Sequence, residues 1–294
     1  MFDASANLTP ILQALLSGLL IGGLFALAAV GLSLVVGVLR IVNLVHGELV
    51  LLGAYAAYVL VQLTGMNPLW LAPLAGVAVA VLAWPLQHFL IQPIVKQREE
   101  VPLLTTFALS IIVQNLLVYF VGADTRSLDG GLSGSRVQLA GLTLPTVQLW
   151  CFAIAMVLCV GVHVLIAHTG LGRRMRASAE DSLAAGVVGV PVQRMYAITY
   201  CLAAAVAGVA GALLATVFSF TPASGVEYLL TGFAVVVLGG LGSIKGTVLG
   251  GLLLGVVESL GAWWLGDGYR LFIGLVVILL LLATHPQGLF GKRV

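Results

Sequence analysis

Apolar segments of the length that crosses a membrane follow one another along almost the whole chain. An α-helix needs about 20 consecutive apolar residues to cross the hydrocarbon core of a bilayer, and short polar or glycine-rich stretches separate these segments. Hydrophobic residues make up 61% of the chain and charged residues only 8%, whereas about 25% of an ordinary soluble domain is charged. The sequence therefore predicts an all-α, polytopic membrane protein.

We expect one transmembrane domain over residues 1–294, with about nine membrane segments (eight to ten) that include broken or re-entrant helices. No room remains for a soluble catalytic domain, so we expect no catalytic residues. The first ten residues contain Asp3 and no Lys or Arg. A signal peptide normally has a positively charged start, so we expect the first span to be retained. The predicted spans are 11–37, 47–63, 69–91, 102–121, 147–168, 196–219, 228–241, 247–265 and 270–285.

Residues 169–195 form a long interior segment that cannot lie in lipid. The segment carries four of the thirteen basic residues, followed by small residues and glycines, which predicts a short surface helix and a turn. Ser178 and Asp181 are spaced to cap such a helix. Small side chains would let another protein approach closely. The alternative is an ordinary, positively charged cytoplasmic connector.

The distribution of basic residues predicts how the chain lies in the membrane. If residues 169–195 are cytoplasmic, alternation of the spans places ten of the thirteen basic residues inside and leaves Arg126, Arg136 and Arg270 outside. Membrane proteins carry such an excess of Lys and Arg in their cytoplasmic loops. The N-terminus is then outside and the C-terminus cytoplasmic. The glycine-rich loop 122–146 becomes an external surface, which we expect to be flexible and which is either a linker or a contact for a soluble partner.

Polar residues beside the second span mark a first candidate site. Asn43, His46, Gly47 and Glu48 precede the apolar run from Leu49, and ionisable groups within a span usually face a cavity or a partner. Because these residues do not share one helical face, we expect a helix break near Gly47. Three roles remain open: mutual satisfaction at the inner mouth of the bundle, contact with a substrate, and a proton relay. The relay lacks a second intramembrane acid at helical spacing.

A second candidate stretch is rich in glycine. Gly239, Gly240 and Gly242 interrupt a span that is already short, and broken helices in transporters line the transport path. The pairs Gly246, Gly250 and Gly251, Gly255 predict close helix packing, and packing is the alternative role for all of these glycines. Ile244 stands where a phosphate-binding loop needs Gly before Lys245, so we expect no ATP site of that type. Glu258 is either an internal hydrogen-bond partner or a pathway residue.

Four stretches of the chain resemble the branched-chain amino-acid permease family of ABC importers. They are the spacing RA-x3-D-x3-A-x3-GV within residues 169–195, Ile41 to Tyr55, Phe233 to Ser259, and the ending His285 to Lys292. In that family the first of these is a cytoplasmic coupling loop whose short helix sits in a groove of a separate ATPase subunit. The residues to which the resemblance gives this role are Arg173, Arg176, Ala177, Glu180, Asp181, Ala185, Gly186 and Gly189.

The resemblance implies a permease subunit in a bacterial inner (plasma) membrane. Its partners would be a second homologous permease subunit, two ATPase subunits, an extracytoplasmic substrate-binding protein and membrane lipid, with no nucleic acid. ATP and Mg²⁺ would bind the ATPases, and we expect no cofactor or metal on this chain. The substrates implied are branched-chain or other amino acids, or alternatively urea or short amides. The alternative class of protein is an ion-coupled secondary transporter or a channel.

Overall fold

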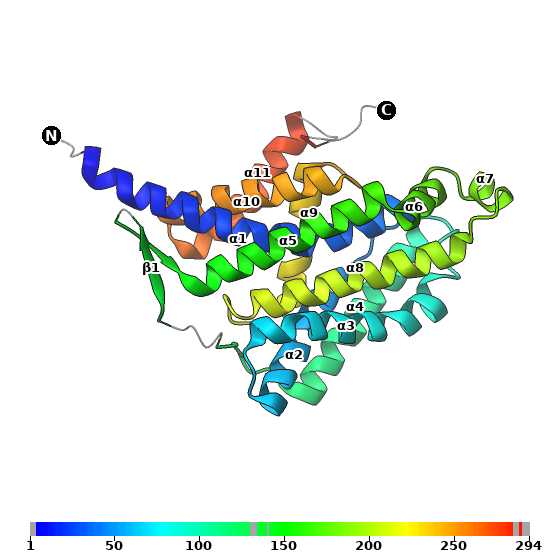
Figure 1. Cartoon of the computed structure of the whole chain (residues 1–294), viewed down its shortest axis with the longest axis horizontal. Coiled ribbons are helices and arrows are strands. Elements are labelled where there is room, and N and C mark those ends of the chain that lie inside the picture. The colour runs from blue at the N-terminus through cyan, green and yellow to red at the C-terminus, as the bar shows by residue number, and fades with distance from the viewer. Residues whose placement is uncertain (1–3, 130–133, 140, 285–287, 290–294) are drawn as a thin grey trace.

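The structure is a computed structural model that describes residues 4–129, 134–139, 141–284 and 288–289. Within these residues, eight helices are long and apolar enough to cross a membrane, and α9 is a shorter apolar helix. This agrees with the predicted all-α membrane protein of about nine segments (Figure 1). The long helices are α1 (Ala4–Leu39), α2 (His46–Thr64), α3 (Pro68–Leu86) continued by the π-helix η1 (Gln87–Ile91), α4 (Glu100–Val121), α5 (Thr146–His168), α8 (Val192–Leu214), α10 (Ile244–Leu265), and the 3-10 helix η2 (Asp267–Tyr269) continued by α11 (Arg270–Thr284).

The first helix, α1, is the central element of the bundle. Its 36 residues extend over about 54 Å, and α5, α8, α9 and α10 all pack against it. Glycines permit the closest of these contacts: a Cβ on Gly18 would lie 2.6 Å from the carbonyl oxygen of Gly255, and a Cβ on Gly251 would lie 2.6 Å from Ala26. The close packing predicted from the glycine pairs of α10 is therefore confirmed.

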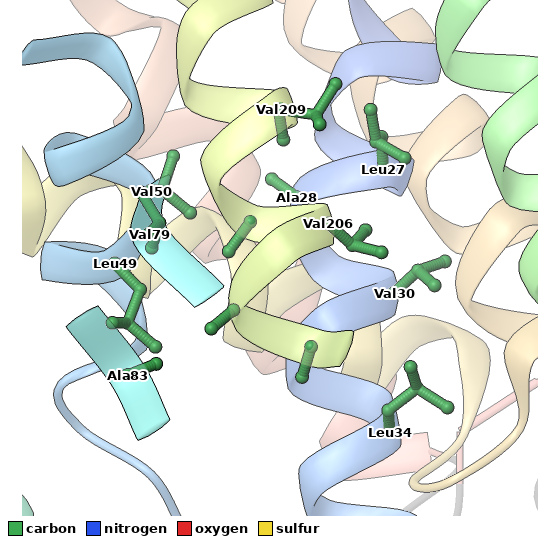
Figure 2. Packing of buried hydrophobic residues seen from close by; sticks show 14 of the residues in the cluster. Leu27, Ala28, Val30, Leu34, Leu49, Val50, Val79, Ala83, Val206 and Val209 are labelled. Atoms are coloured by element: carbon green, nitrogen blue, oxygen red, sulfur yellow. The ribbon is translucent and has the colours of Figure 1, made fainter. Parts of the chain in front are cut away.

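The main apolar core surrounds α8, which lies between α1 on one side and α2 and α3 on the other. Figure 2 shows Val206 and Val209 of α8 between Leu27 and Val30 of α1 and Val50 and Val79 of the neighbouring helices. A Cβ on Gly208 would lie 2.9 Å from the Val79 side chain. Backbones thus approach one another at the crossing of α2, α3 and α8, as small residues allow in membrane bundles.

A break separates α1 from α2. The helix α1 ends at Leu39 and α2 begins at His46, and Arg40 adopts a left-handed backbone conformation with φ 56°. The backbone N–H of Leu44 donates a hydrogen bond to Thr106 Oγ1 of α4 at 3.2 Å. The helix break expected near Gly47 therefore exists, but it lies between Leu39 and His46. His46 and Gly47 are already part of α2.

The short helix α9 (Ser224–Gly239) returns the chain into the bundle. Its 16 residues extend about 24 Å, less than the roughly 30 Å of a bilayer core. It ends in a turn where Gly240 and Gly242 both have positive φ, and Gly242 packs against Gly37 near the end of α1. The predicted ending, His285 to Lys292, lies outside the described residues apart from Gly288 and Leu289, whose N–H donates to the Leu238 carbonyl.

The loop after α4 is more ordered than predicted. It contains a two-stranded antiparallel hairpin, β1 (Arg136–Leu139) and β2 (Leu142–Pro145). The side chain of Gln13 accepts a hydrogen bond from the Thr143 N–H and donates one to its carbonyl. Arg126 exchanges two backbone hydrogen bonds with Phe220 and lies over the Tyr58 ring. These contacts fix the described part of the loop to α1, α2 and the segment after α8, so the expectation of a flexible surface is wrong there.

Candidate functional site

Three polar side chains are buried inside the bundle at the break between α1 and α2. Asn43, His46 and Glu48 are 0%, 1% and 1% exposed. His46 Nε2 lies 2.9 Å from the carbonyl oxygen of Ala28 in α1, and the Ser110 hydroxyl of α4 donates to Glu48 Oε1 at 3.3 Å. The break thus inserts an amide, an imidazole and a carboxyl group between α1, α2 and α4. We call these three residues with Ser110 and Tyr200 the polar cluster.

Much of the hydrogen-bonding capacity of the polar cluster is unused. The following buried atoms have no hydrogen-bond partner in the described part of the chain: both amide atoms of Asn43, His46 Nδ1, Glu48 Oε2 and the hydroxyl of Tyr200. The Tyr200 hydroxyl lies beside the Asn43 side chain. Buried polar groups are paired in the great majority of cases, and an unpaired one costs about 1 to 3 kcal/mol. Buried donors and acceptors without partners around the break therefore suit a polar ligand or water.

The N-terminal end of α9 closes the polar cluster. Gly225 lies against Glu48 so tightly that a Cβ there would be 2.5 Å from the Glu48 carboxyl carbon. A Cβ on Gly47 would meet the Leu229 side chain at 2.8 Å. The positive end of the α9 dipole, which favours anions, therefore faces the carboxyl group. Sequence analysis does not assign Ser110, Tyr200 or Gly225 to this site. Their only signal is a hydroxyl or a glycine within or beside an apolar span.

The other residues predicted for the pathway lie elsewhere. Gly239 packs against Gly246 and Gly250 at the contact of α9 with α10, and Gly240 and Gly242 form the turn between these helices. Glu258 is buried on α10 and faces Gly274 of α11. The structure thus brings together Asn43, His46, Gly47 and Glu48, whereas the glycines at the end of α9 form helix contacts and Glu258 lies at a different helix pair.

Substitutions of Glu48 distinguish the roles left open by the sequence. We expect Glu48→Gln to keep the Ser110 contact and to leave the folded permease intact with measurable uptake. In contrast, Glu48→Leu leaves the Ser110 hydroxyl without this partner and costs about 1 to 3 kcal/mol. Thermal stability and uptake of both variants should be measured side by side. If Glu48→Gln is fully stable but transports nothing, a proton relay would replace this account.

The segment that follows α5 folds into two short helices. Thr169 caps α6 (Gly170–Glu180) by accepting a hydrogen bond from the Gly172 N–H. Asp181 caps α7 (Ser182–Val187) by accepting from the N–H groups of Leu183 and Ala184. The predicted cap at Ser178 is wrong: Ser178 is inside α6 and donates to the Arg174 carbonyl. One predicted helix is thus two, with Asp181 at the junction.

The first of these helices is anchored on the bundle. Arg176 donates to the carbonyl of Ile166 at the end of α5, and the Tyr196 hydroxyl of α8 donates to the Ser178 carbonyl at 3.5 Å. A cavity of about 270 Å³ lies between residues 178–183, Tyr196 and the end of α1 at Val38, Leu39 and Arg40. The helix α6 is therefore fixed to α5 and α8 and lies across this cavity from the end of α1.

The second helix presents an apolar surface to solvent. Leu183, Val187 and Val188 are 76%, 89% and 78% exposed. The helix α7 itself lies at one end of the molecule (Figure 1). We call these three residues the α7 tip. Of the residues that the resemblance assigned to coupling, six are exposed and Ala177 is half-buried. Ala185 is the exception: only 4% exposed, it packs inside this chain. The exposed six are Arg173, Arg176, Glu180, Asp181, Gly186 and Gly189.

Comparison with known proteins agrees with this architecture. The family model described as "Branched-chain amino acid transport system / permease component" matches residues 14–282, which include the polar cluster, α6 and α7. This chain belongs to that family. It is therefore a transport subunit that crosses the membrane several times.

Named relatives match the permease over nearly its full length. It is 30% identical to the high-affinity branched-chain amino acid transport system permease protein BraD of Pseudomonas aeruginosa, over 96% of both chains. It is 28% identical to the corresponding LivH protein of Escherichia coli, again over 96% of both chains. LivM of Escherichia coli is 25% identical over 90% of this chain and 67% of its own length. No solved structure matches the permease.

Proposed function

We propose that the permease is a subunit of an ABC importer that carries branched-chain or related amino acids, with ATP hydrolysed on separate subunits. The observation that carries this proposal is the α7 tip. Its three exposed apolar residues lie on α7 and at its C-terminal end, and α7 follows α6, which is fixed to the bundle. Exposed apolar groups of this kind mark protein contact sites. A separate ATPase docked there would move α6, and through it the helices around the polar cluster.

The chemistry of the polar cluster supports an amino-acid substrate. An amino acid carries an ammonium group and a carboxylate, and its passage needs an acceptor for the first and donors for the second. Glu48 Oε2 and Asn43 Oδ1 are acceptors without a partner among the described residues. The Asn43 amide nitrogen and the Tyr200 hydroxyl, which lie beside each other, can donate. In transporters, broken helices direct their N-termini at anionic substrate groups, and α9 begins beside this cluster.

The proposed assembly contains a second, homologous permease, two ATPases that bind ATP and Mg²⁺, and an extracytoplasmic binding protein. The likeness of this chain to both LivH and LivM of one organism supports a pair of related permeases. We place the complex in the inner membrane, with α6 and α7 on the cytoplasmic side and β1 and β2 outside. This orientation rests on the ten-to-three distribution of basic residues.

Cysteine labelling tests the orientation. In intact cells, an impermeant thiol reagent should label Gly134→Cys in the outer loop and should label Arg173→Cys on α6 only after the membrane is opened. The native cysteines are buried or half-buried, so the unmodified permease is the background control. Labelling of both positions from the same side would overturn the orientation.

Uptake into sealed proteoliposomes tests the function. With the two permeases and the ATPases reconstituted and the loaded binding protein outside, labelled leucine should accumulate only when ATP is enclosed, and a protonophore should have no effect. Unlabelled isoleucine and valine should compete, whereas urea should not. Accumulation that needs an ion gradient and no ATP would assign the permease to secondary transporters, and competition by urea alone would assign it another substrate.

A further inference from the structure

Three side chains that can donate hydrogen bonds gather where the end of α5 meets the start of α10. The rings of His163 and His168 lie 6.5 Å apart, centroid to centroid, and Lys245 is close enough to His163 to act on it electrostatically. Lys245 and His168 are exposed and His163 is half-buried. We call these residues the α5–α10 basic site. It lies at the end of the bundle from which α6 and α7 extend (Figure 1).

No carboxylate of the described chain neutralises this site. The ion pair formed among the described residues is Arg270 with Asp267, at the other end of α10. A lysine at the boundary of a bilayer attracts anionic lipid, and an imidazole has an N–H to offer to a phosphate oxygen. The charge and the donors therefore favour an anionic group.

The surface beyond the basic site is apolar in the pattern that an acyl chain requires. On α5, exposed Val164, Val160 and Val157 precede His168 at steps of four, four and three residues, so they lie on one face of the helix. On α10, exposed Leu249 and Leu253 follow Lys245 at steps of four. Each helix thus has a polar group at the end near the membrane surface. From there an exposed apolar stripe continues toward the centre of the bilayer.

We propose that the α5–α10 basic site binds the phosphate headgroup of an anionic phospholipid, whose acyl chains lie along the two apolar stripes. The assignment to the cytoplasmic leaflet rests on the proposed orientation. The phosphate alone would use only the three donors, whereas the phospholipid also covers the exposed valines and leucines. A bound lipid there would also contact α5 directly before α6, so it would stabilise the helix on which α6 is anchored.

Native mass spectrometry of the delipidated permease complex, with phosphatidylglycerol added, tests this proposal. We expect the complex to retain phosphatidylglycerol in preference to phosphatidylcholine. Lys245→Gln should lower that retention about fivefold, the effect of losing one lysine at an anionic surface, and His163→Gln with His168→Gln should lower it further. Lys96→Gln removes the same charge from another exposed position and should leave retention unchanged. Inorganic phosphate should not displace the lipid.

Three outcomes would overturn the proposal. Equal retention in the wild type and the Lys245→Gln, His163→Gln, His168→Gln variant would show that the lipid binds elsewhere. Displacement by inorganic phosphate would leave a simple anion site. Efficient disulfide formation between Val160→Cys or Leu249→Cys and the second permease would show that protein, and no lipid, covers the stripes. Because retention is measured without transport, failure here would leave the proposed import function standing.

Discussion

Replacing Val187 by Asp should abolish ATP-driven uptake while the permease still inserts and pairs normally. Val187 is 89% exposed at the end of α7, so the substitution disturbs no packing within the chain. It places a charge in the middle of the apolar α7 tip, and disruption of a central interface residue can cost 2 kcal/mol or more, about thirtyfold in affinity. Uptake and binding-protein-stimulated ATP hydrolysis should fall together, and Leu183→Asp should act in the same way.

Two further substitutions serve as controls for the α7 tip. Arg173→Glu changes an exposed charge on α6, and exposed ion pairs contribute only about 0 to 1 kcal/mol, so uptake should fall little. Ala185→Trp is not a clean probe of docking because Ala185 is buried within this chain; it should lower the stability of α7 itself by about 1 to 3 kcal/mol through overpacking. Normal uptake by Val187→Asp and Leu183→Asp would remove the α7 tip from any coupling role.

Gly53→Leu should prevent stable folding of the bundle. A Cβ on Gly53 would lie 2.5 Å from the Cα atom of Gly208 and 2.6 Å from its carbonyl carbon, so any side chain forces α2 and α8 apart. Overpacking of a well-packed core costs about 1 to 3 kcal/mol and sometimes more, and here backbone, which cannot rotate away, forms the obstacle. The amount of monodisperse protein after extraction and its thermal midpoint should both fall sharply.

Gly161→Leu is the matched control for Gly53→Leu. A Cβ on Gly161 would have no atom of the described chain within 4 Å, so the same substitution should leave yield and thermal midpoint near those of the unmodified permease. If both variants were as stable as the unmodified permease, the close crossing of α2 and α8 would be contradicted. Equal loss in both would point to an effect of glycine replacement in spans generally, and not to this crossing.

The spans and the glycine contacts were predictable because they depend on local pattern. Apolar length alone gave the helices to within a few residues, apart from longer ends such as the start of α1. The spacing of Gly251 and Gly255 gave a face of α10 that packs closely on α1. Both signals follow from helix geometry and the length of a bilayer crossing.

The composition of the polar cluster was only partly predictable. Asn43, His46 and Glu48 are conspicuous because polar groups are costly among apolar residues. Ser110 and Tyr200 are ordinary residues of a span, and only the path of the chain between Leu39 and His46 brings them to Glu48 and Asn43. The contact of Gly225 with Glu48 depends in the same way on where α9 re-enters the bundle, which no local pattern records.

The sequence predicts where residues 169–195 leave the membrane, but not how α6 and α7 fold within them. Small residues and charges located this segment, yet the cap at Asp181 and the burial of Ala185 depend on how α6 and α7 meet. The sequence alone does not indicate that Leu183, Val187 and Val188 are exposed, because apolar residues are usually buried. Their exposure became visible only when the structure showed that nothing in the described chain covers them.

Co-purification of the ATPase with the permease, measured for wild type, Val187→Asp and Arg173→Glu, tests the docking account most directly. The account predicts that wild type and Arg173→Glu retain the ATPase and that Val187→Asp loses it, while all three retain the second permease. Full retention of the ATPase by Val187→Asp, together with normal uptake, would contradict the account and leave residues 169–195 as a charged connector.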